Sequence, residues 1–195
     1  LVGDFHYNGH RLLTDFPDAA VEELPLDKAL LDAARTGLRE LNARCAAANQ
    51  DVFLLFHRPR LWNPGEHRWM GYERKRGKLA DFNRLLLTGK ADRFKAVIGD
   101  PQLLQGVRYV ITLDTDTQLP SQAAWKMVGT LAHPLNRPVL DPATQCVKRG
   151  YSVLQPRVAM GLLGSGRSLF AKIFSGDVGL DPYTGDVSNV YHDLF

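Results

Sequence analysis

Apolar and polar positions follow strand-like and helix-like patterns in turn along this chain. Arg11–Thr14 and Asp51–Phe56 are short, largely apolar runs, and we predict a strand at each. Tyr109, Val110, Ile111 and Leu113 form a β-branched and apolar run that is too short for a lone helix, which favours a strand buried on both faces. Tyr151–Val158 is predicted as an edge or bulged strand because Pro156 cannot donate a ladder hydrogen bond.

Three windows carry apolar residues at helical spacing. The first begins at Asp27, which can cap the helix, the second follows a basic segment around Arg76, and the third opens at Pro120. Lys90–Gly106 is predicted to be connective. The apolar faces are, in chain order, Leu30, Leu31, Ala34, Leu38, Leu41 and Cys45; Leu79, Phe82, Leu85 and Leu86; and Ala124, Met127, Val128 and Leu131. Strands that alternate with helices predict an α/β fold.

The composition narrows the class of protein. A chain of 195 residues, 45% hydrophobic and 23% charged, has the make-up of one globular domain that buries a core. Its net charge of +3 is too small to imply a nucleic-acid partner. Two cysteines are too few for a disulfide framework, so we expect a reducing compartment. The sequence has no apolar run of the roughly 18 residues that a membrane span needs.

Two carboxylates follow the strand predicted at Tyr109–Leu113. Asp114 and Asp116 are one residue apart, so in an extended chain both side chains point to the same side. Such a pair can bind one hard cation, Mg²⁺ or Mn²⁺, which in turn can hold a diphosphate. The alternative is an aspartate-rich turn before the next helix.

A second acidic position and a basic segment are further candidates for a ligand site. Asp15 follows the strand at Arg11–Thr14, where it could accept hydrogen bonds from a nucleoside base or ribose, or serve as a loop residue before the next helix. Four cations, Arg74, Lys75, Arg76 and Lys78, precede a helix whose free N–H groups would favour a phosphate. The alternative is a solvated run of charge. Asn83 lies in the same helix and could face the ligand crevice.

Gly161–Ser168 (GLLGSGRS) resembles a phosphate-binding loop, but Arg167 replaces the lysine of that motif. We therefore keep a nucleotide hydrolase as an alternative function, and a non-catalytic interaction domain as another. A flexible loop over the crevice suits this segment better than a triphosphate site.

Several long phrases resemble the glycosyltransferase domain of the bacterial cyclic β-1,2-glucan synthases, in the right order, from about Leu12 to Phe195. They are FHRPRLWNPGE, WMGYERKRGKLADFNRLL, YVITLDTDTQLP, LAHPLNRP, GYSVLQPRV and DPYTGDVSNVYHDLF. The resemblance implies a GT-A-like open, mixed but mostly parallel sheet flanked by helices. It also implies that residues 1–195 are a piece of one catalytic domain, incomplete at both ends and inactive alone.

The implied activity is inverting glucosyl transfer from UDP-glucose to a growing cyclic β-1,2-glucan, with Mg²⁺ or Mn²⁺ as cofactor. The glucan acceptor and the remainder of a larger membrane protein would be the partners, and the location would be the cytoplasmic face of the bacterial inner membrane. The resemblance places the catalytic base beyond Phe195. It implies a metal site at Asp114 and Asp116, an acceptor side at Gln155 and Arg157, and donor binding by Asp15, Arg76, Lys78, Asn83 and Asp114.

Overall fold

The computed structural model describes residues 9–45, 52–115, 117–120 and 122–156. The chain divides into two compact units, Leu1–Val110 and Ile111–Phe195.

The first unit is built on two parallel strands, β1 (His10–Thr14) and β2 (Phe53–His57), which confirms both strand predictions. Leu12 lies opposite Leu55 in the ladder. The connection between them contains the predicted helix α1 (Asp27–Cys45), as a parallel pair requires a long crossover. Asp27 is the first residue of α1, and its carboxylate accepts from the Leu24 N–H and from Arg60 rather than capping its own helix.

A third strand, β5 (Ala96–Ile98), pairs with β2 in the antiparallel direction, so the sheet order is β1-β2-β5. The α/β class is confirmed. The prediction of a mostly parallel sheet is wrong for the described residues, because one of the two pairings in this sheet is antiparallel. The prediction that Lys90–Gly106 is connective is wrong, because this region contains β5. A three-residue strand is too short to show a period in the sequence.

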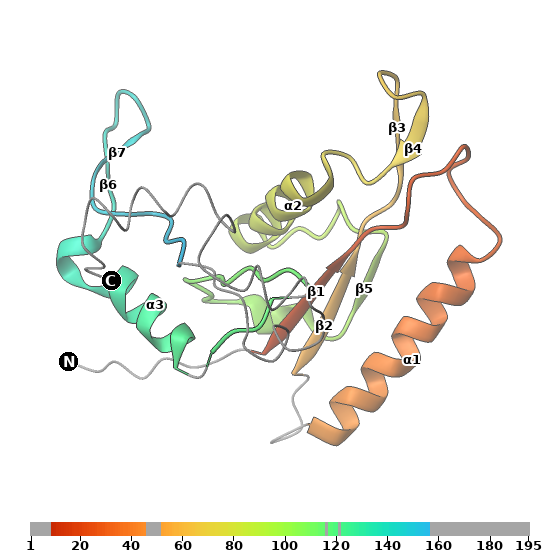
Figure 1. Cartoon of the computed structure of the whole chain (residues 1–195), viewed down its shortest axis with the longest axis horizontal. Helices are drawn as coiled ribbons and strands as arrows, with labels where there is room; N and C mark the ends of the chain where they lie inside the picture. The colour runs from red at the N-terminus through yellow and green to blue at the C-terminus, as the bar shows by residue number, and fades with distance from the viewer. Residues whose placement is uncertain (1–8, 46–51, 116, 121, 157–195) are drawn as a thin grey trace, which may run out of the picture. The chain divides into compact units, whose positions relative to one another are not determined.

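Helices cover both faces of β2 (Figure 1). Side chains alternate between the faces of a strand, so Leu54 and Phe56 point one way and Leu55 the other. Leu54 and Phe56 pack with residues of α2 (Arg74–Thr88), the second predicted helix, and with Leu104 of the short 3-10 helix η1 (Pro101–Leu104). Leu55 packs with Leu38 of α1 and Ile98 of β5. The core of the unit is therefore a three-layer arrangement centred on β2.

A small hairpin of β3 (Leu61–Asn63) and β4 (Arg68–Met70) follows β2 and precedes α2 in the chain. Trp62 and Trp69 are opposite each other in it. Backbone hydrogen bonds of 2.9 Å in both directions join Trp69 to Ala19. The hairpin is thereby attached to the loop that follows β1.

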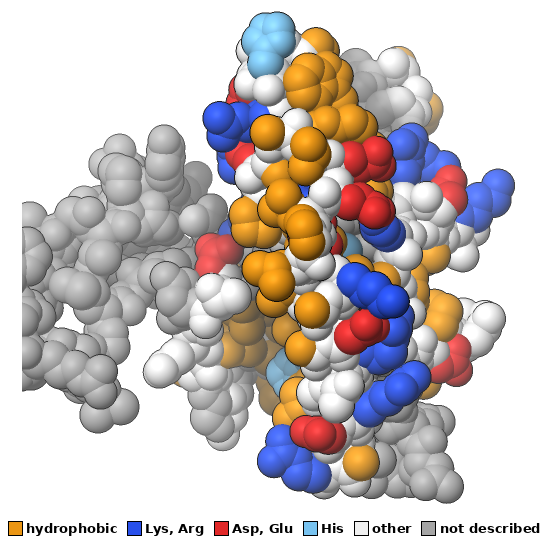
Figure 2. Space-filling model, turned by 90° about the vertical axis from the view of Figure 1, so that its right-hand side faces the viewer, with side chains coloured by type: hydrophobic (Ala, Val, Ile, Leu, Met, Phe, Trp, Pro, Cys, Tyr) orange, Lys and Arg blue, Asp and Glu red, His pale blue; other side chains and the backbone are white. Residues whose placement is uncertain are grey.

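Helix α1 buries less of its predicted apolar face than its spacing suggested. Leu38 is buried and Ala34 packs against the core, whereas Leu30 and Cys45 are exposed. Figure 2 shows apolar side chains along the outer side of this helix. The prediction that Cys45 is a core residue is wrong, because the helix extends past the end of the short sheet that it covers.

The predicted central strand at Tyr109–Leu113 is wrong. No residue from 109 to 113 is in a strand, and Tyr109, Val110, Ile111 and Leu113 are all exposed. A β-branched run forms a strand only where a neighbouring strand supplies hydrogen-bond partners, and none of the described strands does so here. The Thr117 N–H donates to the Asp114 carbonyl oxygen at 3.0 Å, so the alternative prediction of a turn holds at Asp114.

The second unit contains the predicted third helix, α3 (Ala123–Ala132), followed by the 3-10 helix η2 (Pro134–Asn136) and a short hairpin of β6 (Val139–Leu140) and β7 (Val147–Arg149). Residues 151–156 form no strand, which corrects the prediction for the described part of Tyr151–Val158. The Tyr151 N–H donates instead to Asn136, and Pro156 has no N–H to offer a ladder.

None of the helices in the described part of the chain combines the length and the apolar composition that a membrane span requires.

Candidate functional site

The carboxyl ends of β1 and β2 place two charged side chains at one edge of the sheet. Asp15 follows the last residue of β1, and Arg58 follows the last residue of β2. The Arg58 N–H donates to the Thr14 carbonyl oxygen at 3.0 Å, which holds the two strand ends together. Ligands of open α/β sheets bind at this edge.

The Arg58 guanidinium is the centre of the site. Its Nε donates to Asp15 Oδ1 at 2.8 Å, and its Nη2 donates to Asp15 Oδ2 at 3.2 Å. Its Nη1 donates to Asp81 Oδ2 at 3.0 Å, and Nη2 also donates to the Arg74 carbonyl oxygen at 3.0 Å. The side chain is only 5% exposed. A buried cation is tolerated when paired carboxylates and hydrogen bonds offset its loss of hydration.

Helix α2 supplies the rest of the site. Lys78 and Asp81 are three residues apart and therefore share a helix face. Lys78 Nζ lies 3.0 Å from Asp15 Oδ2. We refer to Asp15, Arg58, Lys78 and Asp81 as the strand-end cluster; it holds two cations and two carboxylates, so its charges balance.

The pKa values of Asp15 and Arg58 are each shifted in the direction that favours the charged form. Burial alone would raise the pKa of Asp15, but hydrogen bonds and attraction from Arg58 and Lys78 outweigh it and lower that pKa below its ordinary value. Burial alone would lower the pKa of Arg58, but Asp15 and Asp81 raise it. Asp15 is therefore an ionised acceptor at neutral pH.

Two glycines leave space for the close contacts of the strand-end cluster. A Cβ on Gly71 would lie 2.7 Å from Cγ of Asp15. A Cβ on Gly77, in the first turn of α2, would lie 2.2 Å from the Tyr72 carbonyl oxygen and 2.9 Å from Nη1 of Arg58. Each glycine is thus required by close approach of a charged side chain or the backbone, and not by its own dihedral angles.

His57 and Arg60 lie beside the cluster and support the loop that carries Asp15. His57 is buried, shares a 2.9 Å hydrogen bond with Thr14 Oγ1, and contacts the Phe16 ring edge-on at 4.1 Å between centroids. Arg60 donates to the Pro17 carbonyl oxygen at 2.7 Å and pairs with Asp27 at the start of α1. Burial lowers the pKa of His57, so its imidazole is uncharged at neutral pH.

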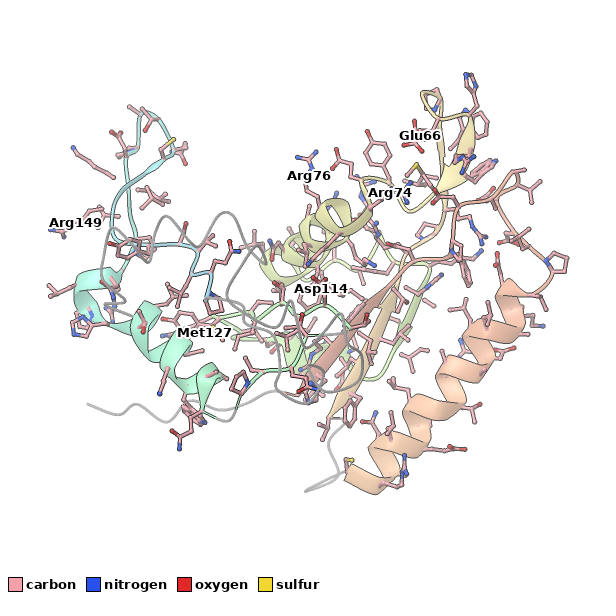
Figure 3. The ribbon with its side chains drawn as sticks, viewed as in Figure 1. Glu66, Arg74, Arg76, Asp114, Met127 and Arg149 are labelled. Atoms are coloured by element: carbon pink, nitrogen blue, oxygen red, sulfur yellow. The ribbon has the colours of Figure 1, made fainter. Side chains whose placement is uncertain are left out.

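A cavity of about 400 Å³ lies between the hairpin and the start of α2. Figure 3 labels Arg74 and Arg76 at the start of α2 and Glu66 on the hairpin. Arg74 pairs with Asp18 at 2.9 Å, and Arg76 pairs with Glu73. The residues that line the cavity are Asn63, Glu66, Met70, Tyr72, Glu73, Arg74 and Arg76.

The structure brings together some of the predicted site residues. Asp15 and Lys78 are in direct contact. Arg76 lines the cavity, and Asn83 is exposed on α2. Asp114 and Gln155 are exposed residues of the second unit. The predictions for Asp116, Arg157 and Gly161–Ser168 fall outside the described residues.

The predicted metal site has one member among the described residues, Asp114. Within the described ranges, no group of three or more His, Cys, Asp or Glu side chains is arranged to hold a metal ion. The metal site at Asp114 and Asp116 therefore stays a prediction.

Sequence reasoning missed Arg58 and Asp81. A signal existed for each: Arg58 follows a predicted strand as Asp15 does, and Asp81 is one helical turn beyond Lys78. The prediction of a phosphate site at the basic segment rests on its four cations and on the free N–H groups of the helix start. In the fold, Arg74, Arg76 and Lys78 are each paired with a carboxylate.

The chain is 48% identical over 184 residues to the cyclic beta-(1,2)-glucan synthase NdvB of Rhizobium meliloti (strain 1021). The aligned part is 94% of this chain but 6% of that synthase. No family model matches the chain. The chain is therefore related to a short stretch of a much longer synthase, which confirms the resemblance to the cyclic β-1,2-glucan synthases.

Proposed function

We propose that this chain is the donor-binding part of a GT-A-type glycosyltransferase that moves glucose from UDP-glucose to a growing cyclic β-1,2-glucan. The observation that carries the proposal is the strand-end cluster, an ionised aspartate fixed at the carboxyl edge of two parallel strands. The relationship to a glucan synthase supports the choice of a sugar nucleotide over other ligands.

Asp15 and Lys78 have complementary parts in donor binding. The Asp15 carboxylate accepts a hydrogen bond from the uridine, because it is 14% exposed and ionised. Lys78 makes one ion pair with the described residues and is 23% exposed, so its ammonium group has further N–H donors for the diphosphate. Arg76 and Asn83, both exposed on α2, extend the same donor side.

Asp114 and Asp116 are the residues that would hold Mg²⁺ or Mn²⁺. When bound, the ion would neutralise the charge that develops on the leaving diphosphate. Gln155 and Arg157 form the acceptor side in this proposal.

Inversion at the anomeric carbon requires a general base on the face opposite the leaving group. We place that base in sequence that follows Phe195, within a larger protein at the cytoplasmic face of the inner membrane. The 195-residue chain would then bind donor without turning it over.

Isothermal titration calorimetry with UDP-glucose and Mn²⁺ tests the proposal. We expect Asp15→Asn and Asp114→Ala to weaken binding about tenfold or more, since each removes an ionised contact to the donor or its metal. Asp92→Ala is the matched control, because Asp92 belongs to an exposed ion pair with Arg84 in the same unit as Asp15. Equal affinity in all four proteins, with melting temperatures preserved, would refute the donor site.

A further inference from the structure

The acceptor positions of Asp15 are almost all occupied by the protein. An ionised carboxylate offers about four lone-pair positions. Oδ1 accepts from Nε of Arg58 at 2.8 Å. Oδ2 accepts from Nη2 of Arg58 at 3.2 Å and lies 3.0 Å from Nζ of Lys78. Among the contacts of the described residues, one position remains open, and it is on Oδ1.

We propose that Arg58 is a positioning residue that limits Asp15 to one ligand hydrogen bond and thereby selects the base of the donor nucleotide. This inference rests on the proposed function, because it assumes that Asp15 faces the base. Arg58 itself is too deeply buried to touch the ligand. It acts through the direction in which it holds the carboxylate.

A single open acceptor suits uracil and does not suit guanine. Uracil presents one N–H donor between two carbonyl acceptors. Guanine presents two adjacent N–H donors on the same edge, and a carboxylate satisfies both only when its two oxygens are available. With Oδ2 occupied, one guanine donor would be left without a partner on leaving water, which is unfavourable. A ribose diol, with two adjacent hydroxyl donors, is disfavoured for the same reason.

Arginine is required because its planar fork fixes both carboxylate oxygens at once. Nε and Nη2 form two parallel hydrogen bonds, which hold the carboxylate plane in one orientation. A lysine at this position would keep the charge but would leave the carboxylate free to rotate. Asp81 and the Arg74 carbonyl oxygen fix the far side of the guanidinium, and Gly77 leaves space for it.

The test is the ratio of UDP to GDP affinity, measured by calorimetry on the 195-residue chain. We expect the wild type to prefer UDP by about tenfold or more, the effect of one unmet hydrogen bond. UDP methylated at uracil N3 lacks the single donor and should bind as weakly as GDP. In Arg58→Lys we expect UDP to bind still, with the preference reduced to about threefold or less.

Two variants separate positioning from general support of the fold. Asp92→Asn removes the charge from the exposed ion pair with Arg84 of α2 and leaves both bonds between Arg58 and Asp15, so the preference for UDP should persist. Arg84→Lys, at an exposed ion pair on the same helix, should also leave the preference unchanged. A merely structural Arg58 would instead weaken UDP and GDP by the same factor when replaced by lysine.

The possible binding results distinguish a failure of base selection, of the Arg58 role and of the proposed function. Equal binding of UDP, GDP and N3-methylated UDP by the wild type would overturn base selection and leave the donor site standing. This comparison needs no variant, so it decides the question even if Arg58→Lys does not fold. An equal loss of UDP and GDP in Arg58→Lys would overturn the positioning role. No binding of either nucleotide by the wild type would refute the proposed function itself.

Discussion

The first unit buries a core, whereas the described part of the second unit does not. Every buried apolar side chain among the described residues lies between Leu38 and Leu104, in the first unit. Helix α3 of the second unit has no buried residue, although its apolar positions follow the helical period as well as those of α1 do. Apolar spacing thus predicts that a helix forms, but burial requires an opposing surface.

Strand β2 supplies that opposing surface in the first unit. Its neighbours are β1 and β5 at its edges and α1 and α2 on its faces, so nearly every side chain of the strand is enclosed. The run at Ile111–Leu113 is similar in composition but has no such neighbours among the described residues, and it is exposed. Two runs of similar composition are thus buried in one case and exposed in the other, according to which elements pack around them.

The largest expected effect comes from removing a side chain at the centre of this core. Phe56 is fully buried and contacts the rings of Phe82 and Phe94 at centroid distances of 5.5 and 5.3 Å. We expect Phe56→Ala to lower the free energy of unfolding by about 3–5 kcal/mol. Leu135→Ala, at a side chain 79% exposed in the second unit, should change it by less than about 0.5 kcal/mol. Urea unfolding followed by circular dichroism measures both.

Comparable losses in Phe56→Ala and Leu135→Ala would break the comparison, since they would mean that Leu135 is buried in solution.

A smaller effect separates two helical glycines of the first unit. Alanine normally stabilises a helix relative to glycine, and nothing lies within 4 Å of a Cβ on Gly37 in α1. We expect Gly37→Ala to raise the free energy of unfolding by about 0.5–1 kcal/mol. Gly77→Ala should lower it by about 1–3 kcal/mol, because its Cβ collides with the Tyr72 backbone and with Arg58. Thermal unfolding of the two variants should therefore shift in opposite directions.

If Gly77→Ala is as stable as Gly37→Ala, the strand-end cluster is more open than described. Weakened UDP binding in Gly77→Ala alone would link the packing to the site.

The smallest expected effect is the pH dependence that His57 confers. Nε2 of His57 is buried and has no hydrogen-bond partner among the described residues. Burial lowers its pKa, as do Lys95 and Arg60 nearby, while Asp15 and Asp27 oppose the shift. The unfolded chain therefore binds a proton more readily below the ordinary pKa of about 6.5, and stability should fall as pH drops from there towards the lower folded pKa.

Chemical unfolding at a series of pH values checks this. His57→Gln should flatten the decline in stability over the pH range just below about 6.5. A wild-type stability that stays constant over this range would contradict the buried neutral imidazole.

The sequence predicted only two of the four residues of the strand-end cluster. Asp15 and Lys78 were identified from their positions after a strand and in a basic segment, and the fold brings them within 3.0 Å of each other. Arg58 was passed over because a lone arginine after a strand has no distinctive spacing. Its importance depends on contacts with Asp15 and Asp81, which are 43 and 23 residues away in the chain.

The sequence by itself determined four elements of the first unit, and it predicted neither β5 nor the hairpin of β3 and β4. Periods of two and of 3.6 are properties of neighbouring residues, so β1, β2, α1 and α2 could be read directly from spacing, and α3 in the second unit as well. Only the tertiary structure decided the direction of β5, the exposure of Tyr109–Leu113 and the carboxylate partners of the cations in the basic segment. Those outcomes depend on which distant groups become neighbours, because strand pairing, burial and charge compensation are each properties of two surfaces and not of one.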